Sequence, residues 1–266
     1  MDLSLLDQLR QANPIVANIS NHVTVDQVAN VQNVIGASPI MSSAPEEAAD
    51  IVQIAQAITV NIGTLAQPQI DQMITLMQAA YQNHKPLVLD PVAVGALKYR
   101  QGVMQQLLTL GTPAIIRGNA GEIAYFAEIE WQANGIDAGQ GTADIVALAQ
   151  TAARKLNTTI LLTGPTDIIT DGTRTTQIFN GTPLFQTHVG SGDMLTGICG
   201  AFIGIHPQDA YQAAVAAAAT FAVTGQLVAA TMPQPLPGSF YPQLLDRLFT
   251  ITSSEINDKL QIKESN

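Results

Sequence analysis

Three glycines surround a single acid in the run Val189-Gly190-Ser191-Gly192-Asp193-Met194-Leu195-Thr196-Gly197, and an apolar helical pattern begins directly after the acid. Glycine lets the backbone turn tightly and approach a ligand. The first amides of a helix have no internal partner, and the helix dipole favours negative charge beside them. The run therefore predicts an anion hole formed by Gly190, Ser191 and Gly192 at the start of a helix.

Asp193 stands at the mouth of this predicted anion hole. A carboxylate there would repel a phosphate, so it is better suited to accept the proton of a hydroxyl that attacks phosphorus. The alternative is an ordinary helix N-cap, which is the commoner role when such a short motif stands alone. The remaining sequence has to separate the two interpretations.

The 266 residues suffice for a sizeable core, and no linker or low-complexity segment divides them, so we expect a single domain over residues 1–266. The single cysteine, Cys199, excludes an internal disulfide and a cysteine-based metal cluster. No secretory signal is recognisable, and polar residues interrupt the apolar segment from Ala210 to Ala230. We expect a cytoplasmic protein without a membrane partner.

The chain is acidic, with a formal net charge of −10 and eleven basic residues that form no cluster or stripe. Nucleic-acid binding requires phosphate neutralisation by lysine and arginine, so nucleic acid is not an expected partner. An anionic ligand would have to be held by backbone amides, a few side chains and a metal ion.

Short apolar segments alternate with amphipathic helical patterns along the chain. This alternation is typical of an α/β fold with three layers, in which helices cover both faces of a mostly parallel central sheet. A hairpin is expected about Asp171-Gly172, and a surface loop over Gln132 to Thr142. The predicted strands of the central sheet cover residues 15–19, 59–62, 86–89, 114–116 and 159–162.

Polar residues mark the carboxyl ends of these strands, where ligands bind in open α/β sheets. Each one alone fits an ordinary loop residue, but the set predicts a site along one edge of the sheet. Its members are Asn18, Asn21, Asn61, Asp90, Arg117, Asn119 and Thr163.

Two acids and one arginine in this region are candidates for holding a phosphorylated ligand. Asp90 and Glu122 suit Mg²⁺, which takes oxygen ligands and keeps several waters. Their alternatives are a turn residue for Asp90 and a capping-box partner for Glu122, because Asn119-x-x-Glu122 has that spacing. Arg117 could clamp a phosphate through two hydrogen bonds, and its alternative is a surface ion pair.

Three further residues receive weaker interpretations. His22 and His188 are candidates for proton chemistry, although a lone histidine is more often a polar packing residue. Met41 fits a pocket wall or a core position.

The set of motifs resembles a known family. Gly190-Ser191-Gly192-Asp193 is similar to the anion-hole motif of ribokinase-like kinases, and Asn119-x-x-Glu122 to their magnesium motif. Further segments resemble the hydroxyethylthiazole kinase family in its order and spacing, from about Pro14 to Leu248. They are Gly36-Ala37-Ser38-Pro39-Ile40-Met41, Asn61-Ile62-Gly63-Thr64-Leu65, Leu89-Asp90-Pro91-Val92 with Gly95-Ala96, Ile116-Arg117-Gly118-Asn119-Ala120 with Glu122-Ile123, and Gly135-Ile136-Asp137-Ala138-Gly139.

The resemblance implies a ribokinase-like fold and a reaction. The γ-phosphoryl group of ATP would pass to the hydroxyl of 4-methyl-5-(2-hydroxyethyl)thiazole in thiamine salvage. Met41 and Gly190 would bind the thiazole, and Arg117 and Thr163 would contact ATP. The resemblance also implies that carboxylates at positions 90 and 122 organise Mg²⁺, and that a homotrimer places the thiazole near a subunit boundary.

The chain departs from the family pattern at one central position, because the family usually carries cysteine where this chain has Asp193. A carboxyl group is ionised at neutral pH whereas a thiol is mostly protonated, so the departure favours kinase chemistry. It weakens the inference about the substrate. Val189 and the segment Ser20-Asn21-His22-Val23-Thr24 are also atypical and could touch the substrate pocket.

Three other functions share parts of this pattern. Nucleotide-dependent dehydratases that repair hydrated NAD(P)H have the same implied fold and a similar Gly-Ser-Gly-Asp segment. Other vitamin kinases of the superfamily act on hydroxymethylpyrimidine or pyridoxal-like alcohols, and a non-catalytic nucleotide-binding protein is a further alternative. The segments from Gly36 to Met41 and from Asn61 to Leu65 favour the thiazole kinases.

Overall fold

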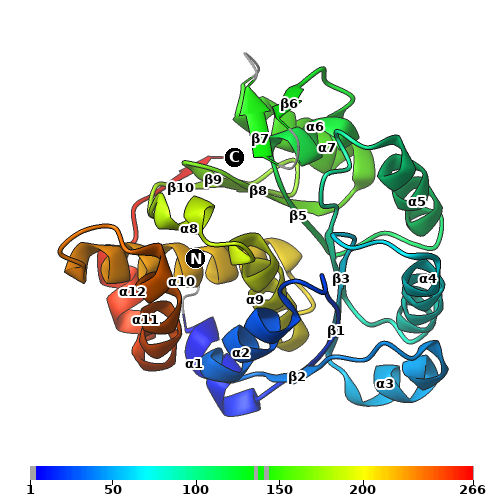
Figure 1. Cartoon of the computed structure of the whole chain (residues 1–266), viewed down its shortest axis with the longest axis horizontal. Helices are drawn as coiled ribbons and strands as arrows, with labels where there is room; N and C mark the ends of the chain where they lie inside the picture. Colours follow the sequence, from blue (N-terminus) through cyan, green and yellow to red (C-terminus); the bar gives the residue numbers. More distant parts are fainter. Residues whose placement is uncertain (1–3, 135–136, 141–143, 266) are drawn as a thin grey trace.

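A nine-stranded sheet forms the centre of the computed structural model, which describes residues 4–134, 137–140 and 144–265. The strand order is β11-β10-β9-β8-β5-β4-β3-β1-β2 (Figure 1). The strands are β1 (Ile15–Ile19), β2 (Ser38–Ile40), β3 (Ala57–Asn61), β4 (Leu87–Asp90), β5 (Ile115–Asn119), β8 (Thr159–Thr163), β9 (Asp167–Thr170), β10 (Thr175–Ile178) and β11 (Ile262–Ser265).

The sheet is mostly parallel, as predicted. Every pairing from β2 across to β8 is parallel, and β8, β9, β10 and β11 continue the sheet with antiparallel pairings. Strands β3 and β4 are buried along their whole length, which is why their sequences read as continuous apolar runs ending in a polar residue.

Helices cover both faces of the sheet and give the three expected layers (Figure 1). Successive strand side chains point to opposite faces, so Val88 joins one core cluster while Leu87 and Leu89 join the other. One layer holds α1 (Leu5–Ala12), α2 (Val25–Ile35), α9 (Ser191–Ile205), α10 (Ala210–Thr231), α11 (Pro237–Thr250) and α12 (Ser253–Lys259). The other holds α3 (Ala48–Ile54), α4 (Gln67–Gln82), α5 (Lys98–Leu108), α6 (Ala120–Ala127) and α7 (Ile145–Leu156). Two short helices, η1 (Pro45–Glu47) and α8 (Leu184–Thr187), lie in connections.

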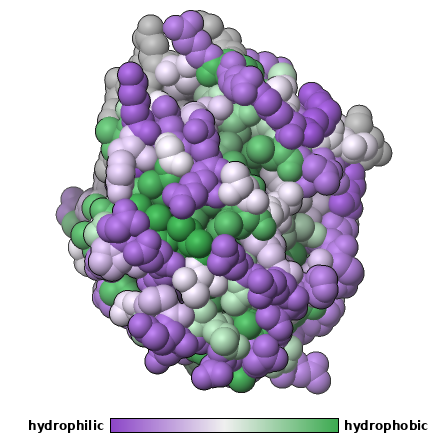
Figure 2. Space-filling model, turned by 90° about the vertical axis from the view of Figure 1, so that its right-hand side faces the viewer, coloured by the Kyte–Doolittle hydropathy of each residue, from purple (hydrophilic) through white to green (hydrophobic). Residues whose placement is uncertain are grey.

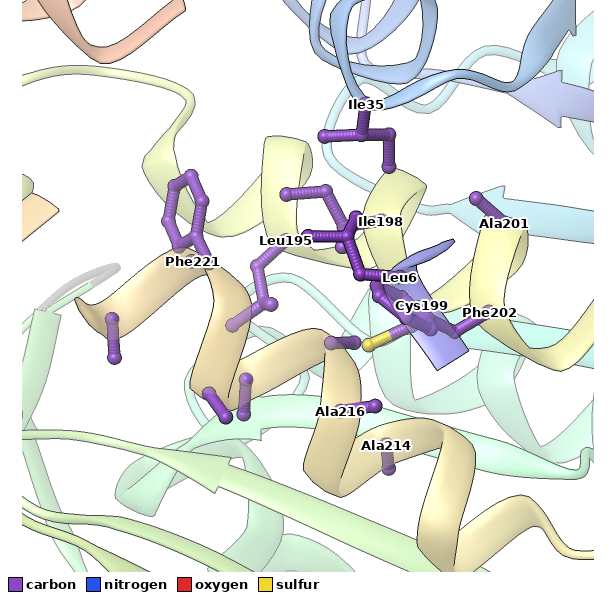
Figure 3. Close-up of a cluster of buried hydrophobic side chains, with 14 of the residues drawn as sticks. Leu6, Ile35, Leu195, Ile198, Cys199, Ala201, Phe202, Ala214, Ala216 and Phe221 are labelled. Carbon is purple, nitrogen blue, oxygen red and sulfur yellow. The ribbon is translucent and has the colours of Figure 1, made fainter. Parts of the chain in front are cut away.

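Helices α9 and α10 pack together in the first of these layers. Within the described residues, α10 is the one helix long and apolar enough to cross a membrane, but 78% of its most apolar window is buried inside the protein. Cys199 of α9 lies in the same core, near Leu6, Phe202 and Ala214 (Figure 3). It is fully buried, and burial raises the pKa of its thiol to about 12.

The predicted surface loop over Gln132 to Thr142 is wrong in part. Residues Gln132–Asn134 (β6) and Asp137–Gln140 (β7) form a separate antiparallel pair, while residues 135, 136 and 141–143 lie outside the described part of the chain. The segment carries turn-type residues without apolar alternation, so its sequence gives little sign of strands.

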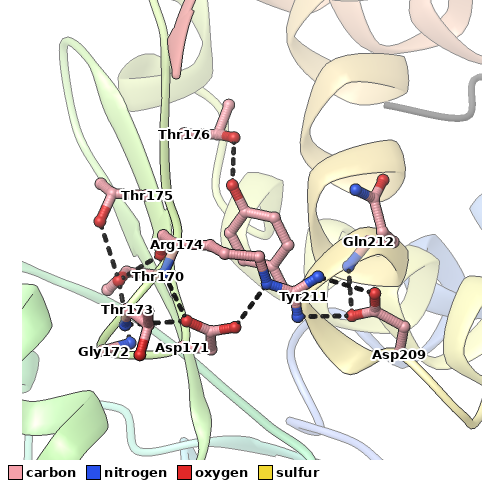
Figure 4. Close-up of polar contacts among 10 residues, drawn as sticks. All are labelled: Thr170, Asp171, Gly172, Thr173, Arg174, Thr175, Thr176, Asp209, Tyr211 and Gln212. Atoms are coloured by element: carbon pink, nitrogen blue, oxygen red, sulfur yellow. Dashed lines mark hydrogen bonds and ion pairs between the residues drawn. The ribbon is translucent and has the colours of Figure 1, made fainter. Parts of the chain in front are cut away.

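An arginine ties the predicted hairpin of β9 and β10 to the start of α10 (Figure 4). The guanidinium of Arg174 donates two hydrogen bonds to Asp209, at 2.8 and 3.0 Å, and one to Asp171 at 2.7 Å. It also lies 4.3 Å from the ring centroid of Tyr211, whose hydroxyl is 2.6 Å from that of Thr176. This cluster joins two segments that are distant in the sequence.

Arg174→Ala is expected to lower the free energy of unfolding at pH 7 by about 1 kcal/mol, because the network is bidentate but its arginine is 41% exposed to screening solvent. The hydrogen bond from Arg174 lowers the pKa of Asp209, so this stabilisation is present above the ordinary carboxyl pKa and is lost as pH falls below it. Thermal melts at pH 7 and pH 3 should show a smaller loss at pH 3. Arg154→Ala, which removes one exposed bond to the same hairpin, is the matched control.

Candidate active site

The predicted helix start lies where three parallel strands end. Helix α9 begins at Ser191, and its N-cap Gly190 has a φ of 98°, a conformation that favours glycine. A side chain at Gly190 would meet Gln27 and Thr24, and one at Gly192 would meet the guanidinium of Arg117. Gly190 is therefore required by its backbone conformation and by the close approach of Thr24, whereas a side chain at Gly192 would displace the guanidinium of Arg117.

Asp193 lies on the first turn of α9, and each of its carboxylate oxygens accepts a hydrogen bond. The hydroxyl of Thr24 donates to Oδ2 at 2.5 Å, and the amide of Asn61 donates to Oδ1 at 2.9 Å. Asn61 was expected at this edge of the sheet. Thr24 was noted only as part of an atypical segment, and no local signal in the sequence links it to a residue 169 positions away.

Asp90, at the end of β4, is fully buried beside Asp193. Its Oδ2 accepts hydrogen bonds from Asn61 at 3.0 Å and Thr196 at 2.7 Å. Its Oδ1 has no hydrogen-bond partner among the residues that the structure describes. Burial raises the pKa of Asp90 to about 7, although the Arg117 guanidinium acts against the shift.

Arg117 links Asp90 to Thr163 at the end of β8. Its Nη1 lies 3.6 Å from Asp90 Oδ2, and its Nη2 donates to the hydroxyl of Thr163 at 2.7 Å. The Arg117 side chain is 13% exposed, so this is a buried arrangement and not a surface ion pair. Strands β5 and β8 are adjacent, which explains why two residues 46 positions apart meet as the sequence predicts.

Glu122 is part of a capping box, which was the alternative to its predicted role as a magnesium ligand. Its Oε2 accepts from the amide of Asn119 at 2.8 Å, while Asn119 Oδ1 accepts from the amide of Glu122 at 3.0 Å. Its Oε1 accepts from the amide of Ala93 at 2.9 Å, which fixes the loop that follows Asp90. Burial raises the pKa of Glu122, and the Arg117 charge and the backbone amides oppose this shift.

A pocket of about 180 Å³ opens at the ends of β1 and β2. Met41 lies on its wall together with His22 and Val25. A pocket wall was one of the two positions expected for Met41. The buried Gln69 of α4 completes one side, with its side-chain nitrogen 3.0 Å from His22 Nε2. The pocket is bordered by the atypical segment 20–24, whose last residue binds Asp193.

The two weaker histidine candidates differ in position. His22 lines this pocket, whereas His188 stacks on Tyr241 with ring centroids 4.8 Å apart. Burial lowers the pKa of His188. Its contact is that of a packing residue.

The chemistry available at this edge of the sheet is that of phosphoryl transfer to an alcohol. A carboxylate stands at a glycine-rich helix start, next to a buried arginine and a second, protonatable acid. Within the described residues, no three His, Cys, Asp or Glu side chains gather as a set of metal ligands. A cation would therefore need ligands from a bound substrate or from water.

The sequence profile of the hydroxyethylthiazole kinase family matches residues 6–254. The chain belongs to the hydroxyethylthiazole kinase family. It is 66% identical over 264 residues to a hydroxyethylthiazole kinase of Latilactobacillus sakei, with 99% of this chain and 98% of the relative covered. The family resemblance inferred from the sequence is thus confirmed.

Solved structures share the fold of this chain. The structure of a hydroxyethylthiazole kinase protein from Pyrococcus horikoshii matches with a TM-score of 0.89 at 31% identity, covering 99% of this chain and 98% of that one. An ADP/ATP-dependent NAD(P)H-hydrate dehydratase from Bacillus subtilis, co-crystallised with ATP and Mg²⁺, matches with a TM-score of 0.60 at 15% identity over 90% of each chain. The second likeness is one of fold alone.

Proposed function

We propose that the chain transfers the γ-phosphoryl group of ATP to the hydroxyl of 4-methyl-5-(2-hydroxyethyl)thiazole, in thiamine salvage. The observation that carries the proposal is the position of Asp193, held by two donors at a glycine-rich helix start beside the buried Arg117–Asp90 pair. Membership of the hydroxyethylthiazole kinase family supports the choice of substrate.

In this mechanism, the substrate hydroxyl lies between Asp193 and the γ-phosphorus. Its oxygen forms the new bond to phosphorus, the bond from the γ-phosphorus to the bridging oxygen breaks, and Asp193 accepts the hydroxyl proton. The backbone amides from Gly190 to Asp193 stabilise the charge on the transferred group. Met41 and Gly190 contact the thiazole, and Arg117 with Thr163 holds the phosphates of ATP.

Asp90 and Glu122 are proposed to organise Mg²⁺. The buried Oδ1 of Asp90, which has no hydrogen-bond partner in the described chain, fits a cation or its water ligand. Both oxygens of Glu122 already accept backbone hydrogen bonds, so Glu122 suits an indirect contact through water. A bound Mg²⁺ would supply positive charge against the phosphate groups of ATP.

We also propose that the chain folds as one domain over residues 1–266 and works as a cytoplasmic homotrimer with the thiazole site near a subunit boundary. Val23 and Val189, which flank Thr24 and the anion hole, are 64% and 71% exposed. A second apolar area, ringed by polar side chains, lies on the face that carries α3, α4 and α5 (Figure 2). Exposed apolar surface of this kind is typical of subunit contacts.

The proposed function is tested by measuring ADP release from Mg²⁺-ATP with and without the thiazole, followed by mass detection of the product. ADP release that requires the thiazole and yields thiazole phosphate is the expected result. Stronger stimulation by hydroxymethylpyrimidine or a pyridoxal-like alcohol would keep the kinase and change the substrate. ADP release that is the same with and without an alcohol, or dehydration of hydrated NADH, would contradict the proposal.

A further inference from the structure

Thr24 stands at the N-cap of α2 but does not cap the helix. Threonine is a favoured N-cap because its side-chain oxygen can accept a bond from the amides of the first turn. Within the described chain, Thr24 makes no such side-chain capping bond. A residue that forgoes its favoured local role points to a competing function elsewhere.

The hydroxyl of Thr24 is directed at Asp193 instead. A hydroxyl has one proton to donate, and the distance from Thr24 Oγ1 to Asp193 Oδ2 is 2.5 Å. The other acceptor within reach, the carbonyl oxygen of Asn21, is 3.4 Å away. Thr24 is fully buried, so water does not compete for this proton.

The methyl group of Thr24 faces the start of α9. A Cβ built on Gly190 would lie 2.7 Å from Thr24 Cγ2. Helix α2 thus approaches the start of α9 so closely that only glycine fits between them. The methyl group of Thr24 thus lies towards Gly190 of the anion hole, while its hydroxyl binds the acid beside it.

Asn61 holds the opposite oxygen of Asp193, and its amide is itself fixed. Its Nδ2 donates to both Asp193 and Asp90, at 2.9 and 3.0 Å, and its Oδ1 accepts from the amide of Gly63 at 2.7 Å. With one donor on each oxygen, the Asp193 carboxylate cannot rotate freely. Each oxygen still has a lone pair to accept the substrate hydroxyl.

We propose that Thr24 is a positioning residue for phosphoryl transfer, whose hydroxyl fixes the orientation of the Asp193 carboxylate at the expense of capping α2. The inference rests on the proposed role of Asp193 as proton acceptor. A carboxylate that loses one of its two donors can turn away from the reacting hydroxyl, and small misplacements of this kind are costly in rate.

The test compares Thr24→Val, which keeps the shape and removes the hydroxyl, with Thr24→Ser, which keeps the hydroxyl. We expect Thr24→Val to lower kcat by about 10- to 100-fold with KM for ATP nearly unchanged, since a lost hydrogen bond to a charged group has that weight. Thr24→Ser should retain most of the activity. Thr224→Val, which removes an equally buried hydroxyl within α10, is the matched control and should leave kcat unchanged.

A double-mutant cycle separates positioning from a general structural effect. If Thr24 acts through Asp193, Thr24→Val should cause no further loss in the Asp193→Asn background. If Thr24→Val lowers kcat in the Asp193→Asn background by the same factor as in the wild type, the inference is overturned. A wild-type kcat in Thr24→Val alone would also overturn it. Both outcomes leave the base assignment intact. Wild-type turnover in Asp193→Asn alone would overturn both. Thermal melts of each variant verify that the compared proteins are folded.

Discussion

Asp193→Asn is expected to lower kcat by about 10²- to 10⁴-fold, the usual contribution of a positioned general base. Asparagine has nearly the same shape and can still receive the hydroxyl of Thr24, but its amide cannot accept the substrate proton at neutral pH. The measurement is the thiazole-dependent rate of ADP release at saturating substrates.

The affinity for ATP provides the control for this variant. Among the described residues, Asp193 makes no hydrogen bond to Arg117 or Thr163, so titration calorimetry should give an ATP dissociation constant close to that of the wild type. Turnover equal to the wild type would remove Asp193 from the role of base.

Arg117→Ala is expected to raise the KM for ATP by about 10- to 100-fold, since hydrogen bonds to charged groups contribute ~1.5–3 kcal/mol each. The side chain is nearly buried and joins Asp90 to Thr163, so its loss also leaves Asp90 without the cation that opposes the rise of its pKa. Asp90 should then take up a proton near neutral pH. Steady-state kinetics with varied ATP measure the first effect.

Two further variants serve as controls for Arg117→Ala. Arg117→Lys keeps the charge but lacks the planar fork, so it should recover only part of the ATP affinity. Arg247→Ala removes a guanidinium whose ion pair with Glu255 lies partly exposed on α11 and α12, and its KM for ATP should not change. A KM equal to the wild type in Arg117→Ala would exclude Arg117 from the nucleotide site.

The parts of this fold that local sequence controls could be predicted. The glycine spacing around Ser191 gives the start of α9, and the switch from apolar to polar residues gives the carboxyl end of β4 at Asp90. Parallel strands end at one edge, so Arg117 and Thr163 could be expected at the same edge of the sheet, where the structure shows them hydrogen-bonded.

The donors around Asp193 could not be predicted in the same way. Asn61 lies 132 positions from Asp193 and Thr24 lies 169 positions from it, so their contacts depend on how layers pack. Nothing in the local sequence around Thr24 indicates this contact, and only the packed structure shows where its hydroxyl goes. Strand β11 was also missed, because its exposed residues 262–265 carry no apolar alternation and gain order from pairing with β10.

The burial of Cys199 has a consequence for the chemical robustness of the catalyst. A thiol reacts with peroxide and with alkylating agents as its thiolate, and only where those reagents can reach it. The single sulfhydryl of this chain, that of Cys199, lies inside the core, where burial raises its pKa. Thiol-blocking reagents therefore find no accessible cysteine in the folded protein, and the proposed proton acceptor, Asp193, is a carboxylate that such reagents do not modify.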